Sequence, residues 1–268
     1  MFSEISILKE HCGFFKQILK LSVLEIEKSY KGTLFGILWV LIKPIVTLIM
    51  FWFVFEFGIR SNAPVNGISK FDFMAVGFVA WFFMQDAILA GVHCLRRNKA
   101  FVTKIKFPVS TIMTINCLAR LYVHIILFVL LYIYLIFKGI GFSIFNIQIF
   151  YYMPMMFLFF LCLSWTTSMY SAYSKDFENT VQAFIQGLFW ISGVLWNTYT
   201  IQNEVIKNIM LFNPVNYFVN GYRKAFLYDE WFWNYPLENS VFLLEFAIIF
   251  MLGIYNYKKL RRNIADVI

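Results

Sequence analysis

Six long apolar blocks, separated by short charged or polar segments, dominate the pattern of the chain. They are Thr33–Ile59, Phe71–Val92, Val109–Phe137, Ile147–Tyr173, Thr180–Tyr199 and Leu237–Tyr257. A helix needs about 20 apolar residues to cross the hydrocarbon core of a bilayer, and every block reaches that length. Backbone groups in lipid must be hydrogen-bonded within the segment, which favours helices. The pattern therefore predicts an all-α polytopic membrane protein with six transmembrane helices.

Two segments outside these blocks also have a helical pattern. Between Glu4 and Tyr30, apolar residues recur at helical spacing among lysines and glutamates, which predicts an amphipathic helix in the cytoplasmic interface. The alternative is a helix packed on a soluble partner. Between Thr200 and Pro236 the chain carries ten aromatic residues. An aromatic interfacial belt explains part of that content, and we expect short outer re-entrant helices between spans five and six. Asn213-Pro214 suits the start of one of them.

Composition agrees with a membrane protein, and the basic residues predict its orientation. The 268 residues are 60% hydrophobic and only 14% charged, whereas soluble domains average about 25% charged. Fifteen Lys and Arg residues lie in the two terminal segments and the even-numbered loops, against six in the opposite loops. Both termini are therefore predicted to be cytoplasmic. We interpret 1–268 as one domain, with an interface helix (1–32), a six-span region (33–257) and a cytoplasmic tail (258–268).

No motif for catalysis is present in the sequence. It has no G-x-x-x-x-G-K-[ST] phosphate loop, no H-E-x-x-H and no G-x-S-x-G. The four cysteines are scattered, which favours neither a disulfide framework nor a metal site. We predict no catalytic residue, metal or cofactor on this chain. Asp86 and Arg120 are expected to form a structural ion pair between neighbouring spans. An ion-coupled transporter or membrane enzyme remains the alternative, and would need Asp86, Arg120 or His124 to act chemically.

Two spans carry polar stripes that predict a polar route. Span one places Trp39, Lys43 and Thr47 at intervals of four residues. The stripe of span five consists of Gln182, Gln186, Phe189, Gly193 and Asn197. Polar residues at bilayer depth should face protein or water rather than lipid. Each of these residues alone could equally form a hydrogen bond that holds two helices together, but two stripes in one chain favour a shared pathway.

The cytoplasmic loop from His93 to Pro108 mixes basic with apolar residues. A positive-inside anchor explains the charge, and the apolar residues favour a short docking helix. The residues of interest are Arg96, Arg97, Lys99, Phe101 and Lys104. The later segment Ser174–Asn179 is predicted to be a tight charged cytoplasmic turn.

Several short motifs resemble one transporter family. They are Tyr30-Lys31-Gly32, Leu38-Trp39, Lys43-Pro44, Lys106-Phe107-Pro108, Asn213-Pro214-Val215 and Tyr222-Arg223. Together they resemble the ABC-2-type polysaccharide export permeases. The run Phe57–Pro64 and the run Leu227–Trp231 are most similar to the wall teichoic acid translocation permeases of Gram-positive bacteria.

The resemblance implies a multi-pass cell-membrane permease that acts as a homodimer with two copies of a separate ATP-binding subunit. ATP and Mg would then be bound on that partner. Its cargo would be a polymer linked to polyprenyl diphosphate. That polymer would be wall teichoic acid, or alternatively O-antigen, capsule or another cell-wall glycan. Membrane lipids are expected as further partners, and nucleic acid is not expected as one. Spans one and five would line the route, and the His93–Pro108 residues named above would couple to the ATPase. Outer-gate candidates are Asn213, Pro214, Tyr217, Tyr222 and Arg223. Lys175-Asp176 departs from the Arg-Asp that the family often has after span four.

Overall fold

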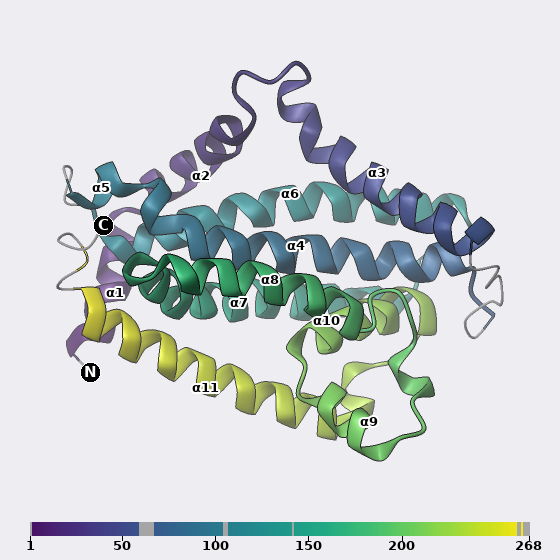
Figure 1. Cartoon of the computed structure of the whole chain (residues 1–268). Helices are drawn as coiled ribbons and strands as arrows, with labels where there is room; N and C mark the ends of the chain where they lie inside the picture. The colour runs from purple at the N-terminus through teal and green to yellow at the C-terminus, as the bar shows by residue number, and fades with distance from the viewer. Residues whose placement is uncertain (1, 59–66, 104–106, 141, 262–263, 265–268) are drawn as a thin grey trace.

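The computed structural model describes residues 2–58, 67–103, 107–140, 142–261 and 264, and these form helices and their connections without a β-strand. Figure 1 shows the long helices running roughly side by side. The α-helices are α1 Phe2–Gly13, α2 Phe15–Tyr30, α3 Trp39–Phe53, α4 Lys70–Arg97, α5 Lys99–Thr103, α6 Val109–Phe137, α7 Ile149–Tyr173, α8 Lys175–Ile191, α9 Glu204–Leu211, α10 Pro214–Arg223 and α11 Pro236–Leu260. The short 3₁₀- or π-helical pieces are η1 Gly36–Leu38, η2 Val54–Gly58, η3 Ile144–Gln148, η4 Thr198–Thr200, η5 Lys224–Tyr228 and η6 Phe232–Asn234.

Five described helical segments are long and apolar enough to cross a membrane. They are Gly36–Gly58, Lys70–Arg97, Val109–Phe137, Ile144–Tyr173 and Pro236–Leu260. The third matches the predicted block at both ends, and the others overlap their predicted blocks. The all-helical membrane fold is thus confirmed.

The fifth predicted span is displaced along the sequence. Thr180–Tyr199 was expected, but α8 runs from Lys175 to Ile191, has 17 residues, and is shorter than the five segments above. The predicted turn Ser174–Asn179 is wrong, because Ser174 accepts a hydrogen bond from Phe177 N and caps α8. The charged residues that follow form its first turns. At about 1.5 Å per residue, 17 residues lie at the lower limit for a span. The count of six spans therefore stays a prediction that depends on α8.

Helix α4 forms the centre of the bundle and α3 its edge. Within the most apolar stretch of each span, 78% of the residues are buried in α4, but only 6% in the segment that contains α3 and 11% in α11. Helices α6, α7 and α10 all pack on α4. Figure 1 shows α1, α5 and the last turn of α11 at one end of the bundle, with α9 and α10 toward the other. We call these the α5 end and the α10 end.

The N-terminal segment forms two helices rather than the single amphipathic helix expected. The break lies at Phe14, and α2 packs on α6 through Ile18, Ser22 and Ile26. Helices α2 and α3 then form an inverted V whose apex points away from α6 (Figure 1).

The segment after α8 contains the short helices predicted for it. Asn213 accepts hydrogen bonds from Val215 N and Asn216 N, and Pro214 follows it in the first turn of α10, as expected for a helix start. Helix α10 packs against α4 and α7 instead of lying on the surface, so the chain re-enters the bundle here.

Candidate functional site

A polar recess lies beneath the inverted V. Its charged and aromatic lining comes from four helices: Tyr30 of α2, Trp39 and Lys43 of α3, Asp86 of α4, and Arg120 and His124 of α6. We call it the basic recess. The Lys43 ammonium lies 5.5 Å from the centroid of the Tyr30 ring and 5.9 Å from that of the Trp39 ring, within cation–π range. Lys43 therefore faces the bundle, as its place on a polar stripe predicted.

The predicted ion pair between Asp86 and Arg120 is not formed in the described structure. Both residues line the basic recess, but no ion pair joins them, and Arg120 Nε is buried without a hydrogen-bond partner. Helices α4 and α6 pack closely and both side chains line the opening between them, but their charged atoms stay beyond ion-pair distance.

A second opening, the α3–α8 groove, adjoins the recess. Both are lined by Thr47, Phe82 and Gln85, so they meet along α3 and α4. Gln186 and Phe189 of α8, two residues of the span-five stripe, complete the groove. The Phe189 ring lies 5.3 Å from the ring centroids of Phe51, on α3, and Trp81, on α4. An aromatic cluster therefore holds α3 against α4 and α8 next to the groove.

The remaining residues of the span-five stripe lie elsewhere. Gln182 Nε2 is 3.2 Å from His93 Nε2 near the α5 end. Gly193 follows α8 in a turn with φ +67°, and the Asn197 side chain caps η4 by accepting from Tyr199 N. The expectation that Gly193 and Asn197 continue a helical stripe is thus wrong, because α8 ends at Ile191.

Arg223 is fully buried and joins three segments of the chain. Its Nη1 and Nη2 atoms donate to the carbonyl oxygens of Gly193 and Val194, both at 2.7 Å. Its Cζ atom lies 3.5 Å from the centroid of the Phe73 ring on α4. A Cβ atom at Gly77 would stand 2.7 Å from Arg223 Nη2, so this glycine makes room for the guanidinium. Arg223 therefore ties α10 to α4 and to the chain leaving α8.

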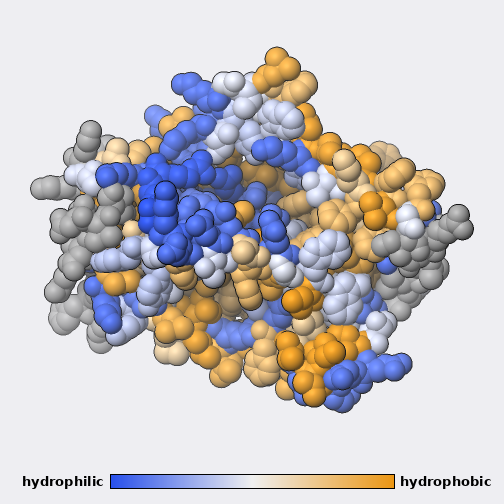
Figure 2. Space-filling view, in the orientation of Figure 1, coloured by the Kyte–Doolittle hydropathy of each residue, from blue (hydrophilic) through white to orange (hydrophobic). Residues whose placement is uncertain are grey.

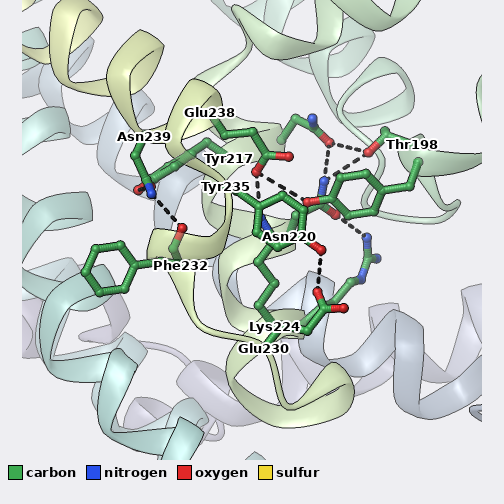
Figure 3. A network of polar contacts seen from close by, with 12 residues as sticks. Thr198, Tyr217, Asn220, Lys224, Glu230, Phe232, Tyr235, Glu238 and Asn239 are labelled. Carbon is green, nitrogen blue, oxygen red and sulfur yellow. Dashed lines mark hydrogen bonds and ion pairs between the residues drawn. The ribbon is translucent and has the colours of Figure 1, made fainter.

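The neighbouring cation, Lys224, centres a polar network shown in Figure 3. Its Nζ atom is 2.6 Å from Glu238 Oε2 of α11 and 3.3 Å from the centroid of the Tyr235 ring. Burial lowers the pKa of Lys224, and Glu238 opposes that shift. Burial raises the pKa of Tyr199, because it disfavours the charged form of each group. The Tyr199 hydroxyl donates to Glu238 at 3.3 Å.

The other predicted outer-gate residues are also structural partners here. Tyr222 is fully buried, and its hydroxyl lies 2.7 Å from His124 Nε2. The Tyr217 hydroxyl donates to Asn239 Oδ1 at 2.7 Å, and its ring stacks on Phe242 at 4.2 Å between centroids. Asn213 caps α10 and donates to Ser192 Oγ. These contacts hold α10 in place, so any gate movement requires breaking them.

The predicted coupling loop contains the short helix α5, but Arg96 and Arg97 lie in the last turn of α4. Arg96 donates to Ser171 O at 2.7 Å, and Arg97 lies 3.9 Å from Glu25 Oε1 of α2. Lys99 begins α5 and Phe101 packs on Phe107, while Lys104 lies outside the described residues. Figure 2 shows hydrophilic residues gathered toward the α5 end and hydrophobic residues along α3 and α11.

Several site residues gave no clear signal in the sequence. Gln85 lines both openings, but it lies on α4, outside both of the polar stripes that the sequence showed. Glu178 lies 2.6 Å from His93 Nδ1 and joins α8 to α4 near the α5 end. In the sequence, Glu238 resembles an ordinary acidic residue in the first turn of a helix, and only the fold brings Lys224 to it. Among the described residues, no three His, Cys, Asp or Glu side chains cluster as metal ligands would.

A bundle in which five described helical segments are long and apolar enough to cross a bilayer defines an integral, multi-pass membrane protein. The model of the ABC-2 type transporter family matches residues 16–227. The chain belongs to this family.

Curated relatives match nearly the whole chain at low identity. The O-antigen export system permease protein RfbA of Myxococcus xanthus is 22% identical over 228 residues, which cover 83% of this chain and 84% of that protein. A protein of the same description from Klebsiella pneumoniae is 20% identical over 266 residues, covering 97% and 98%. The chain is thus similar to transporter permease subunits rather than to enzymes.

Proposed function

We propose that this chain is the permease subunit of an ABC exporter that moves lipid-linked wall teichoic acid from the cytoplasmic to the outer side of the cell membrane. ATP hydrolysis on a separate subunit drives the movement, so ATP and Mg are bound there. Membership of the ABC-2 family supports the transporter class. The cargo proposal depends on the basic recess, because Lys43 and Arg120 offer positive charge within apolar spans to the phosphate groups of a lipid-linked cargo.

The active unit is proposed to hold two permeases and two ATP-binding subunits. Only 6% of the residues in the most apolar stretch around α3 are buried, although this helix lines one side of both openings. A second copy packed on α3 encloses the α3–α8 groove and gives the polymer a route between two protein walls. ATP-driven movement reaches the bundle through α5 and the last turn of α4, where Arg96 and Arg97 contact α7 and α2.

A second cargo, O-antigen or a related neutral glycan, is favoured by the similarity of the chain to O-antigen export system permease proteins. The two cargoes differ in charge, since teichoic acid carries a phosphate in each repeat. Lys43→Leu should reduce export of both, because both are carried on a polyprenyl diphosphate, but the loss should be larger for the polyanion, whose repeats also carry phosphate.

The experiment is reconstitution of the chain with its candidate ATP-binding subunit in proteoliposomes. Polyprenyl-diphosphate-linked teichoic acid should stimulate ATP hydrolysis and appear on the opposite face, whereas a neutral lipid-linked glycan of the same length should act more weakly. Equal stimulation by both assigns the chain to general glycan export. Full export by the permease without any ATP-binding subunit contradicts the transporter class itself. Export should not respond to an imposed proton gradient, because neither Asp86 nor Arg120 is proposed to carry protons.

A further inference from the structure

Three ionisable side chains line the basic recess at bilayer depth without forming an ion pair among the described residues. Lys43 and Asp86 are exposed to it, and Arg120 is half-buried. Arg120 Nε is buried and has no hydrogen-bond partner. Buried polar groups are normally satisfied, and an exception calls for a ligand or bound water. The incompletely satisfied guanidinium of Arg120 on α6 therefore indicates a place for an acceptor.

The charge of the recess specifies an anion. Two cations face one carboxylate, which leaves one net positive charge where unpaired charge is costly. A guanidinium suits the oxygen atoms of a phosphate, and an ammonium on the facing helix adds a second contact. Asp86 limits how tightly an anion is held, which suits a group that must leave again. The space, about 230 Å³, admits a phosphorylated headgroup.

The surroundings indicate that the anion is borne by a lipid. Trp39, Phe82 and Phe83 add apolar and aromatic walls to the recess. The apex of the inverted V, which leads into Trp39, is strongly apolar and exposed: Leu34 is 92% exposed and Ile37 57%. The Phe35 ring contacts the Trp39 ring at 5.6 Å between centroids. An acyl or prenyl chain can thus lie along α3 while its phosphate reaches Lys43 and Arg120.

We propose that the basic recess binds the phosphate group of a polyprenyl carrier lipid, which enters sideways from the bilayer between α2 and α3. This proposal rests on the proposed function and names the part of the cargo that the subunit recognises. The polymer itself passes along the adjoining α3–α8 groove, which begins at Thr47 and Gln85 where the two openings meet. The site belongs to a single subunit, so it needs no second copy to be complete.

The test measures lipid binding to the purified full chain in nanodiscs of neutral lipid, using polyprenyl monophosphate as the probe. Lys43→Gln and Arg120→Gln should each weaken binding about tenfold, since each removes one contact to the phosphate. Lys207→Gln, which removes an exposed cation on α9, is the matched control and should bind as the wild type does. Asp86→Asn should bind several-fold more tightly, a gain that misfolding cannot produce.

Competitors then identify the source of the phosphate. Phosphatidylglycerol and inorganic phosphate should each compete at least tenfold more weakly than the polyprenyl probe. Equal competition by phosphatidylglycerol contradicts recognition of a carrier, and equal competition by inorganic phosphate contradicts a role for the lipid chain. Unchanged affinity in all three recess variants overturns the site. Binding is measured without polymer or ATP, so a chain that binds the probe normally but exports nothing contradicts the proposed function and leaves this inference intact.

Discussion

The guanidinium of Arg223 donates a 2.7 Å hydrogen bond to the carbonyl oxygen of Gly193, two residues after α8 ends. This contact joins the re-entrant helix α10 to the displaced end of span five. It also shows how a short α8 is accommodated, because the chain that would have extended the helix instead supplies carbonyl oxygens to a buried cation.

Arg223→Lys should destabilise the protein, because one ammonium cannot bond two carbonyl groups in the fork geometry of a guanidinium. Hydrogen bonds of charged groups are worth roughly 1.5–3 kcal/mol each, so a loss of about 3 kcal/mol is expected. Thermal unfolding in detergent measures it as a lower Tm. Lys207→Arg, at an exposed position of α9, is the control. Equal Tm values for wild type and Arg223→Lys contradict the structural role.

Gly193→Ala should also be destabilising, for two separable reasons. The positive φ costs an L-residue about 1–2 kcal/mol, and the new Cβ would meet Thr198 Cγ2 at 2.5 Å. Adding Thr198→Ser removes that methyl group, so it should recover only the part of the lost stability that is due to the clash. Gly187→Ala on α8 meets nothing within 4 Å and should be neutral or slightly stabilising. Chemical unfolding of the four proteins compares these effects; similar stability for both alanine variants would refute the argument.

Glu238→Gln should leave Lys224 buried without its carboxylate. Breaking a buried pair from one side costs about 3–5 kcal/mol, whereas replacing both partners by apolar residues is often neutral. The double variant Lys224→Met with Glu238→Leu should therefore be more stable than Glu238→Gln alone. Adding the single variants Lys224→Met and Glu238→Leu completes a double-mutant cycle, and unfolding midpoints of its four proteins measure the coupling. If the single and double variants are equally stable, the ion pair does not matter to the fold.

Thr47→Trp should obstruct the point where the basic recess meets the α3–α8 groove. We expect export in the reconstituted transporter to fall more than tenfold while the amount of assembled complex is unchanged. Leu244→Trp places the same bulk at an exposed position of α11, outside both openings and away from the proposed contact with a second copy, and should leave export near normal. Normal export by Thr47→Trp argues that cargo does not pass there.

Cys12 should report the side of the membrane on which α1 lies. It is exposed, whereas Cys94, Cys117 and Cys162 are buried. A thiol reagent that cannot cross membranes should therefore label only Cys12, in inverted vesicles and not in intact cells. A Cys12→Ser variant, which should remain unlabelled in both, is the control. Labelling of Cys12 from outside intact cells reverses the predicted orientation.

The sequence predicted the features that depend on local composition. The block Val109–Phe137 became α6 with the same bounds, because a span must be apolar along its whole length. Asn213-Pro214 began α10 as predicted, since capping depends on neighbouring residues alone. The end of span five was wrong because Ser192 to Asn197 are as apolar as the helix before them. What ends the helix there is the positive φ of Gly193 and its bond to Arg223, which lies 30 residues away.

By itself, the sequence determined that this protein is helical, embedded in a membrane and built from apolar spans with a few charged residues among them. Only the tertiary structure decided what those charged residues do. Lys43, Asp86 and Arg120 come from three helices, and periodicity along one helix cannot say which neighbour each side chain faces. Packing of α3, α4 and α6 directs all three into one recess, whereas α10 and α11 bring Lys224 directly to Glu238. Hydropathy depends on the residue and its neighbours in the chain, but charge pairing depends on distances that only the fold sets.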